Sequence, residues 1–276
     1  MRKVIPILLV LATLGAAGCD DTTAPRDVTP PGAPRGVFSV TGDGQAKLQW
    51  LANTEADLAG YRVYESPCAS GPNCPYDRVG TTTDTKFAVS GLTNGVTRFF
   101  AVSAVDRAGN ESPLSPENVF DTPRPAGTAT LANFVTNSAG AGWNFAAASV
   151  RASDDLTTDI YFGDNGSVSQ MFATNSNNST EPNTEIQDAG YATTLDAVDF
   201  APNNGWSPTG TVEMIPGHCY IVWTKDDHYA KFRVIGLSHL QVGLEWAYQT
   251  AQGNPELHAR PARQEPGTPR ALAWLR

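Results

Sequence analysis

The sequence of 276 residues is longer than one typical domain and long enough for two. Its formal net charge of −9 and isoelectric point near 4.9 argue against a nucleic-acid partner, because a phosphate-binding surface needs a basic patch. Hydrophobic residues make up 41% of the chain, enough for packed cores. No apolar run reaches the roughly 18 residues that a membrane-spanning helix needs.

The first residues have the order of an export signal. A short basic region, Arg2-Lys3, precedes an apolar stretch from Val4 to Leu14, and small residues then lead into Cys19. This stretch resembles the lipobox of bacterial lipoproteins, although Ala16 stands where that family more often has leucine. The resemblance implies a signal peptide over residues 1–18, acylation of Cys19 and a lipid anchor in the membrane of the bacterial cell envelope. An ordinary secretory signal, cleaved before the cysteine, is the alternative.

A polar, proline-rich stretch follows over residues 19–34. It has no hydrophobic periodicity, and its composition predicts an extended, semi-rigid tether between the membrane and the first domain. Asp20 and Asp21 resemble the inner-membrane retention signal of enteric lipoproteins. Because that rule does not hold in all bacteria, the choice between inner and outer membrane stays open.

Three cysteines remain after Cys19. Cys68 and Cys74 bracket the loop-like stretch Ala-Ser-Gly-Pro-Asn. In an oxidising compartment this spacing favours a disulfide bond over a metal site, since no histidine or second cysteine pair is close in the sequence. Cys219 lies within an apolar strand pattern, where a free cysteine is usually a small buried hydrophobic residue.

Residues 35–123 consist of short alternating segments separated by turn signals, the pattern of a β-sandwich. Trp50, the stretch from Asp57 to Tyr64 and the stretch from Val102 to Ser112 match spaced motifs of fibronectin type III modules. The resemblance implies a spacer or a protein-binding surface and no chemistry. One departure is Arg98, which stands where that family has a tyrosine at the start of the sixth strand. The corner hydrogen bond made by the tyrosine is therefore expected to be missing.

Proline and glycine in residues 123–127 mark a domain boundary. Residues 128–257 repeat strand-like segments without a helical period, so the second domain is also predicted to be all-β, as a sandwich or a barrel-like fold. Asn165-Gly166 lies between two apolar segments and predicts a hairpin. The tail over residues 258–276 is rich in arginine and proline and is predicted to be disordered.

The densest apolar alternation runs from His218 to Gln249. It predicts a three-stranded meander with turns at Lys225–Asp227 and Gly236–Ser238, in which Ala230 lies opposite Leu244. Because successive side chains of a strand point to opposite faces, the pattern sorts these residues into two sets. The predicted core face holds Tyr220, Val222, Ala230, Phe232, Val234, Leu240, Val242, Leu244 and Trp246.

The opposite face of the meander carries the candidate ligand-binding residues. These are Trp223, Tyr229, Lys231, Arg233 and Glu245, with Trp223, Tyr229 and Glu245 predicted in one row. A face that mixes aromatic and charged side chains is typical of sugar- or peptide-binding surfaces. Amphipathic packing is the alternative, with the aromatic rings lying under a loop from the earlier half of the domain and a cation paired with Glu245 across strands.

Common catalytic patterns are missing from the sequence. The four histidines form no His-x-x-x-His or His-Glu-x-x-His arrangement, and there is no Gly-x-Ser-x-Gly elbow or phosphate-cradling glycine loop. Adjacent carboxylates such as Asp226-Asp227 point apart on an extended chain, which makes them poor acid and base partners. We therefore expect a protein that is not an enzyme and has no metal site.

The closing strands, through Thr224, Tyr229–Val234 and Ala247–Gln249, also resemble HmuY-type lipoproteins. That resemblance implies haem capture through paired histidine or methionine side chains. The candidates by residue type are Met171, Met214, His218 and His228. The sequence thus leaves three functions open: a protein that presents a ligand- or partner-binding domain on a fibronectin-type spacer, a haem-capture lipoprotein, and a polysaccharide-binding accessory protein.

Overall fold

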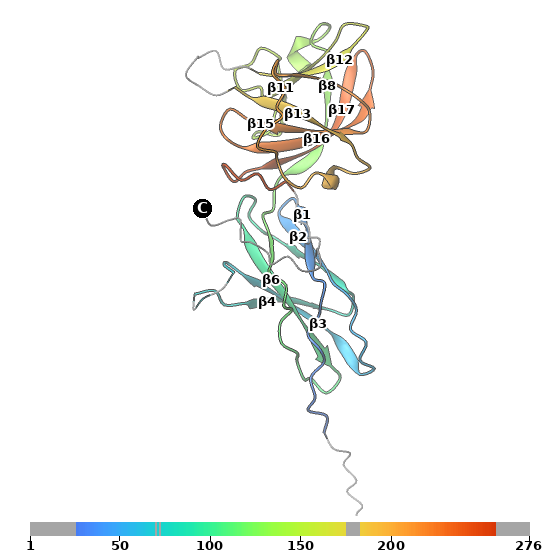
Figure 1. The fold of residues 1–276 in the computed structure, drawn as a ribbon, viewed down its shortest axis with the longest axis vertical. Coiled ribbons are helices and arrows are strands. Elements are labelled where there is room, and N and C mark those ends of the chain that lie inside the picture. Colours follow the sequence, from blue (N-terminus) through green and yellow to red (C-terminus); the bar gives the residue numbers. More distant parts are fainter. Residues whose placement is uncertain (1–25, 70, 72, 175–182, 258–276) are drawn as a thin grey trace, which may run out of the picture.

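The computed structural model describes residues 26–69, 71, 73–174 and 183–257, which form two domains stacked end to end (Figure 1). The predicted signal peptide, Cys19 and the tail lie outside the described residues. The helical segments among the described residues are two short 3-10 turns, η1 (Ser138–Gly140) and η2 (Leu195–Ala197), so the predicted all-β class is confirmed. In this part of the chain no helix is long and apolar enough to cross a membrane.

The N-terminal domain is a β-sandwich of two antiparallel sheets, with strand orders β1-β2-β5 and β4-β3-β6-β7. Its core is closed by Trp50, whose ring meets Tyr61 edge-on at 5.2 Å between centroids. At the position of the usual tyrosine, Arg98 forms an ion pair with Glu65 at 3.3 Å. The strands are β1 (Phe38–Gly42), β2 (Gln45–Gln49), β3 (Leu58–Ser66), β4 (Asp77–Thr82), β5 (Lys86–Ser90), β6 (Arg98–Asp106) and β7 (Val119–Asp121).

Two features at the edges of this domain bear on the sequence predictions. Cys68 and Cys74 are joined by a disulfide bond with 5.2 Å between their Cα atoms, as predicted. The described part of the predicted tether, residues 26–34, has no regular secondary structure. Its Gly32 nevertheless exchanges hydrogen bonds with the domain, donating to Glu55 at 2.6 Å and accepting from Asn53 at 2.8 Å.

The C-terminal domain is a second sandwich of two five-stranded antiparallel sheets, with orders β10-β9-β11-β12-β14 and β13-β15-β16-β17-β8. Large apolar side chains from both sheets fill the space between them, including Phe162, Met171, Tyr220 and Phe232. The strands are β8 (Ala126–Ala132), β9 (Gly142–Asn144), β10 (Ser149–Arg151), β11 (Ile160–Asp164), β12 (Ser169–Ala173), β13 (Glu185–Tyr191), β14 (Thr211–Glu213), β15 (His218–Trp223), β16 (Tyr229–Leu237) and β17 (Gln241–Gln249).

Hairpin geometry follows the turn chemistry of the sequence in two places. Strands β11 and β12 pair across the turn at Asn165-Gly166, as predicted. Strands β15 and β16 pair across Lys225–Asp227, where Asp227 has a φ of 63° and its amide donates to the Thr224 carbonyl at 3.0 Å. Asp and Asn tolerate this left-handed conformation better than other residues with a Cβ, which fits the acidic turn.

The second turn of the meander differs from the prediction. Strand β16 continues to Leu237 through a bulge between Val234 and Gly236, so that Ala230 pairs with Tyr248 rather than with Leu244. The predicted register was therefore wrong by four positions. An even shift keeps every side chain on its predicted face, and the core-face residues are buried apart from Leu240. Leu240, predicted in the core, lies in the turn itself and is 66% exposed.

Candidate functional site

The five candidate residues lie on the outer face of the sheet β13-β15-β16-β17-β8, on the side away from the main core. Trp223 pairs with Tyr229 across β15 and β16, as predicted. Glu245 pairs with Arg233, and not with the Trp223–Tyr229 row, because of the four-residue register shift. The structure thus brings the five residues to one face but separates Glu245 from the aromatic pair.

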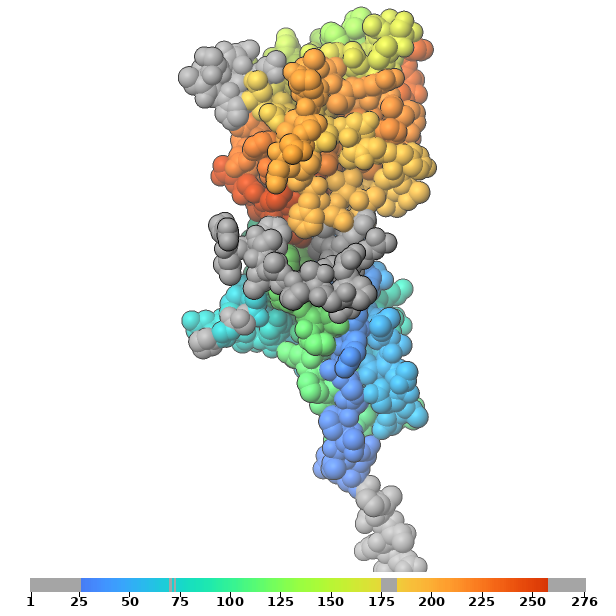
Figure 2. Space-filling model, viewed as in Figure 1, coloured from blue at the N-terminus to red at the C-terminus, as the bar shows by residue number. Residues whose placement is uncertain are grey.

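Most of this outer face is covered by the segment over residues 192–206, which includes η2. In the space-filling view this yellow-to-orange part of the chain forms much of the visible surface of the C-terminal domain (Figure 2). Apolar side chains of the segment and of the sheet pack together in a second, smaller hydrophobic cluster. Its members are Leu195, Val198, Ala201, Cys219, Ile221, Ala247 and Leu257. Cys219 is a buried free thiol in this cluster, as its apolar surroundings in the sequence predicted.

Lys231 holds the covering segment in place from below. Its side chain is fully buried, and its Nζ donates hydrogen bonds of 2.9 Å to the carbonyl oxygens of Leu195 and Val198. Burial, reinforced by the nearby positive charge of Arg124, lowers the pKa of Lys231 to about 7. Its ammonium group is therefore directed at backbone carbonyls of the protein and away from solvent.

Arg233 has a similar role one pair further along β16. Its Nε donates a 2.8 Å hydrogen bond to the carbonyl of Ala192, at the start of the covering segment. Lys231 and Arg233 therefore clamp the segment to the sheet at two points. Two of the five candidate residues, Lys231 and Arg233, thus donate hydrogen bonds to the protein's own backbone.

A strip of three aromatic rings remains at the margin of the covered face, and we call it the aromatic strip. Trp223 stacks on Tyr229, with 5.5 Å between ring centroids and 19° between ring planes. The ring of Trp206, from the covering segment, lies 6.0 Å from that of Trp223 between centroids. All three rings are partly exposed. The Trp223 indole donates to Asp227 at 2.9 Å, which fixes its orientation.

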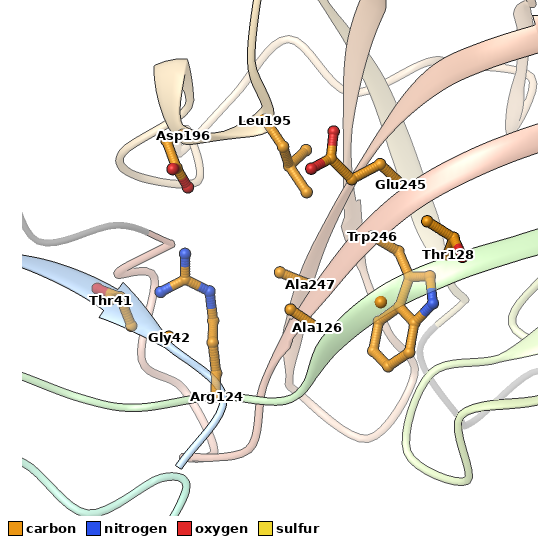
Figure 3. Close-up of a pocket in the computed structure, with 11 residues that line it drawn as sticks. Thr41, Gly42, Arg124, Ala126, Thr128, Leu195, Asp196, Glu245, Trp246 and Ala247 are labelled. Carbon is orange, nitrogen blue, oxygen red and sulfur yellow. The ribbon is translucent and has the colours of Figure 1, made fainter. Parts of the chain in front are cut away.

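Glu245, the fifth candidate, lies in a different place. It lines a cavity of about 320 Å³ between the two domains, which we call the interdomain cleft. The cleft is lined by Thr41, Gly42, Arg124, Ala126, Gly127, Thr128, Leu195, Asp196, Glu245, Trp246 and Ala247. In Figure 3 the Arg124 guanidinium and the Asp196 carboxylate point toward one another on one side, and Glu245 lies on the other, with Ala126 and Ala247 between them.

Arg124 is the central cation of the domain boundary. It is only 3% exposed, and three carboxylates act on it, those of Asp121, Glu256 and Asp196. Burial lowers the pKa of Arg124 and raises that of Asp121 to about 6. Burial and the neighbouring Asp121 raise the pKa of Glu256 to about 7.

The boundary is also held by hydrogen bonds that cross between the domains. The linker is bonded to each domain, because the Arg124 amide donates to the Gly42 carbonyl of the first domain at 3.1 Å and the Pro125 carbonyl accepts from the Tyr248 amide of the second at 3.0 Å. The Thr122 hydroxyl reaches Glu256 at 3.4 Å, which links the end of the first domain to the last described residues of the second. These contacts give the cleft defined walls.

Sequence reasoning missed the residues that shape the cleft from outside the meander. Arg124 stands in a Pro-Arg-Pro stretch that indicated only a domain boundary, and Asp196 and Thr128 belong to no recognisable motif. The one available signal was the position of Arg124, a charged residue between two prolines where two domains meet. Trp206 is likewise part of no motif that pointed to the aromatic strip.

The haem candidates do not converge on one surface. Met171 and Met214 lie in the main hydrophobic core. His218 is the first residue of β15 and contacts Asp188 at 3.0 Å, whereas His228 lies just before β16 and contacts Asp226 at 3.5 Å. Neither the cavity between the domains nor the one beside Tyr61 and Arg62 is lined by any of these four residues.

One group of carboxylates could approach a cation. Oxygens of Asp27, Asp57 and Asp106 lie within 4.8 Å of one another in the N-terminal domain. The carboxylate of Asp106 already accepts two hydrogen bonds of 2.8 Å from Asn110, one from its backbone amide and one from its side chain. These bonds form a local turn, and nothing beyond the acidic cluster points to a metal.

Comparison with known proteins finds that parts of the chain are similar to segments of much longer proteins. It is 35% identical over 103 residues to an amylopullulanase of Thermoanaerobacterium thermosulfurigenes, covering 37% of this chain and 5% of that protein. It is 30% identical over 154 residues to exoglucanase B of Cellulomonas fimi (52% and 13%), and 33% identical over 143 residues to chitinase Chi52 of Paenibacillus xylanexedens (49% and 25%). The chain spans a quarter or less of the length of these relatives.

No protein-family model matches the chain. Among solved structures, a fibronectin type III-like protein of Clostridium thermocellum is 25% identical, with a TM-score of 0.29. That alignment covers 35% of this chain and 98% of the other.

Proposed function

We propose that this chain is a non-catalytic polysaccharide-binding protein, in which the fibronectin type III-like domain is a spacer that presents the C-terminal sandwich. The relatives that share 30–35% identity with it are, by name, an amylopullulanase, an exoglucanase and a chitinase. The shared segments are small parts of those enzymes, which favours an accessory role over a catalytic one.

The aromatic strip is the observation that carries a glycan-binding role. Trp206, Trp223 and Tyr229 offer neighbouring, partly exposed rings, and flat rings with a polar edge suit the apolar faces and hydroxyl groups of sugars. Trp206 packs against the second hydrophobic cluster, and the Trp223 indole is bonded to Asp227. A strip held in this way loses little conformational entropy when a ligand binds.

A pull-down on insoluble starch, cellulose and chitin tests this function. Trp223→Ala should weaken retention on the bound polysaccharide about fivefold to tenfold, as expected for the loss of one aromatic contact worth about 1 kcal/mol. Trp223→Phe, which retains a ring, should restore part of the binding. Tyr191→Ala is the matched control, because Tyr191 is a 70% exposed aromatic residue on the same sheet but outside the strip.

Two results would count against the proposal. If the wild-type protein is retained on none of the three polysaccharides, the binding function is wrong. If Trp223→Ala binds as well as wild type, a polysaccharide site must lie elsewhere. A thermal melt of each variant shows whether lost binding reflects lost folding.

Attachment to the cell envelope belongs to the same proposal. It rests on the export signal and the lipobox-like residues that end at Cys19. A lipid-anchored protein would keep its glycan-binding domain at the envelope, with the fibronectin-type domain as a spacer. Cys19→Ala should move the protein from the membrane fraction to the soluble fraction, and continued membrane association would show that the anchor is not at this cysteine.

A further inference from the structure

The interdomain cleft has a chemical character that the aromatic strip does not share. Its floor is made of small side chains on the outer face of the sheet, Ala126 and Thr128 of β8 and Ala247 of β17. Small residues at three adjacent positions leave open space where larger side chains would fill it. The floor can therefore approach a ligand closely without polar atoms in the way, apart from the Thr128 hydroxyl.

The walls of the cleft carry both signs of charge. Arg124 contributes a cation, and Asp196 and Glu245 contribute carboxylates. An anionic ligand would meet the carboxylates of Asp196 and Glu245, and a cationic ligand would meet the guanidinium of Arg124. A neutral ligand with both donors and acceptors suits this balance.

The size of the cleft limits the ligand further. A cavity of 320 Å³ is at the small end of known ligand pockets, with room for roughly ten water molecules at ~30 Å³ each. That is comparable to one sugar ring with its hydroxyl groups. Apolar contact with Ala126, Ala247 and Leu195 and polar contact with Arg124 and Glu245 would match the two kinds of surface that a sugar ring presents.

We infer that the interdomain cleft is a second glycan subsite, which holds one neutral sugar unit of a polysaccharide between the two domains. This inference rests on the proposed polysaccharide-binding function but places a binding contact outside the aromatic strip. Residues of both domains line the subsite, with Thr41 and Gly42 on one side and β8, η2 and β17 on the other. The fibronectin-type domain is then part of the binding site as well as a spacer.

Calorimetric titration of the full two-domain protein with soluble oligosaccharides tests the subsite. The neutral probes are maltohexaose, cellohexaose and N-acetylated chitohexaose; oligogalacturonate and deacetylated chitohexaose are the anionic and cationic probes. Thr128→Trp would fill the cleft from an exposed position on β8 and should weaken binding of the neutral probe at least tenfold. Thr130→Trp is the matched control, because Thr130 is exposed on the same face of the same strand but does not line the cleft.

A second variant separates ligand binding from a change in domain packing. Glu245→Gln keeps the shape of the side chain and removes one acceptor charge, and it should weaken the neutral probe about threefold to tenfold without lowering the melting temperature. Normal binding by both Thr128→Trp and Glu245→Gln would overturn the inference. Tighter binding of either charged probe than of every neutral probe would also overturn it.

The titration distinguishes this inference from the proposed function on which it rests. If Trp223→Ala abolishes binding and Thr128→Trp does not, the protein binds polysaccharide through the strip and the cleft inference is wrong. If both variants weaken binding, both sites are supported. If the wild-type protein binds no oligosaccharide and no insoluble polysaccharide, the function and the subsite fail together.

Discussion

Lys231 allows a sharp test of how the covering segment is held. A neutral amine has two hydrogens, and two carbonyls, those of Leu195 and Val198, accept hydrogen bonds from Nζ at 2.9 Å. A third proton would add a positive charge in a fully buried position close to Arg124. The fold therefore favours the neutral amine, which is the physical reason for the lowered pKa.

The size of the effect follows from the pKa in each state. The pKa of Lys231 falls from 10.5 to about 7 on folding, so between these values the unfolded chain carries one more proton than the folded one. Stability then rises with pH by up to about 1.4 kcal/mol per unit. From pH 7, where Lys231 is half protonated in the folded state, to pH 9 the gain is about 2.3 kcal/mol. The stability that the neutral Lys231 amine contributes is fully present above its pKa in the unfolded chain. It is lost as the pH falls through its pKa in the folded protein.

Lys231→Met removes this term and keeps the length of the side chain. We expect the free energy of unfolding of wild type, minus that of the variant, to increase by about 2.3 kcal/mol between pH 7 and pH 9. At pH 9 the variant should be less stable by about 2 kcal/mol or more, because two buried carbonyls lose their donor. The amides of residues 192–201 should also exchange faster.

Urea unfolding followed by tryptophan fluorescence at several pH values gives these free energies. Lys225→Met is the charge-matched control, since Lys225 lies in the partly exposed turn between β15 and β16. A difference between wild type and Lys231→Met that stays constant from pH 7 to pH 9 would refute the buried neutral amine. Unchanged amide exchange in residues 192–201 would refute its role as a clamp.

Three further predictions address other parts of the fold. Burial and Asp121 raise the pKa of Glu256 from 4.5 to about 7, so the wild type should lose up to about 3 kcal/mol of stability as the pH rises from 4.5 to 7. In urea titrations, Glu256→Gln should make that loss smaller. Replacing Cys68 and Cys74 by serine should lower the free energy of unfolding by about 2 kcal/mol, the loop-closure entropy of a short loop; an unchanged urea midpoint would contradict this. Gly163→Ala should cost about 1–2 kcal/mol, because its Cβ would lie 2.4 Å from the Phe134 ring; an equal cost in a Phe134→Ala background would show that the ring is not responsible.

The faces of the meander could be predicted from sequence, while its register could not. Side-chain alternation has a period of two, so the large apolar residues from Tyr220 to Trp246 identify the core face whatever the register. Register depends on where the chain turns, and the glycine at position 236 indicated a turn where the structure has a bulge. The true turn, at Ser238–Leu240, contains no glycine or proline.

The candidate site shows a similar division. The sequence grouped Trp223, Tyr229, Lys231, Arg233 and Glu245 correctly on one face. It kept open the alternative that a loop covers the two aromatic residues, whereas the covering segment binds Lys231 and Arg233 and leaves both rings partly exposed. Which loop covers which residue depends on contacts such as Lys231 with Val198, which are far apart in the chain and follow no local pattern. For the same reason the cleft, whose walls come from both domains, had no counterpart in the sequence.

The order of strands in the C-terminal sheet has a consequence for folding during synthesis. Strand β8 opens the domain, and its partner in the sheet is β17, in which Ala247 pairs with Ala126. Strand β8 must therefore leave the ribosome long before its partner exists, and its backbone donors and acceptors have no strand to pair with until the domain is almost complete. Its sequence, AGTATLA, has only one large apolar side chain, Leu131. While it is unpaired, a strand of this composition exposes little hydrophobic surface to other nascent chains. The late pairing of β8 with β17 therefore carries a low risk of aggregation.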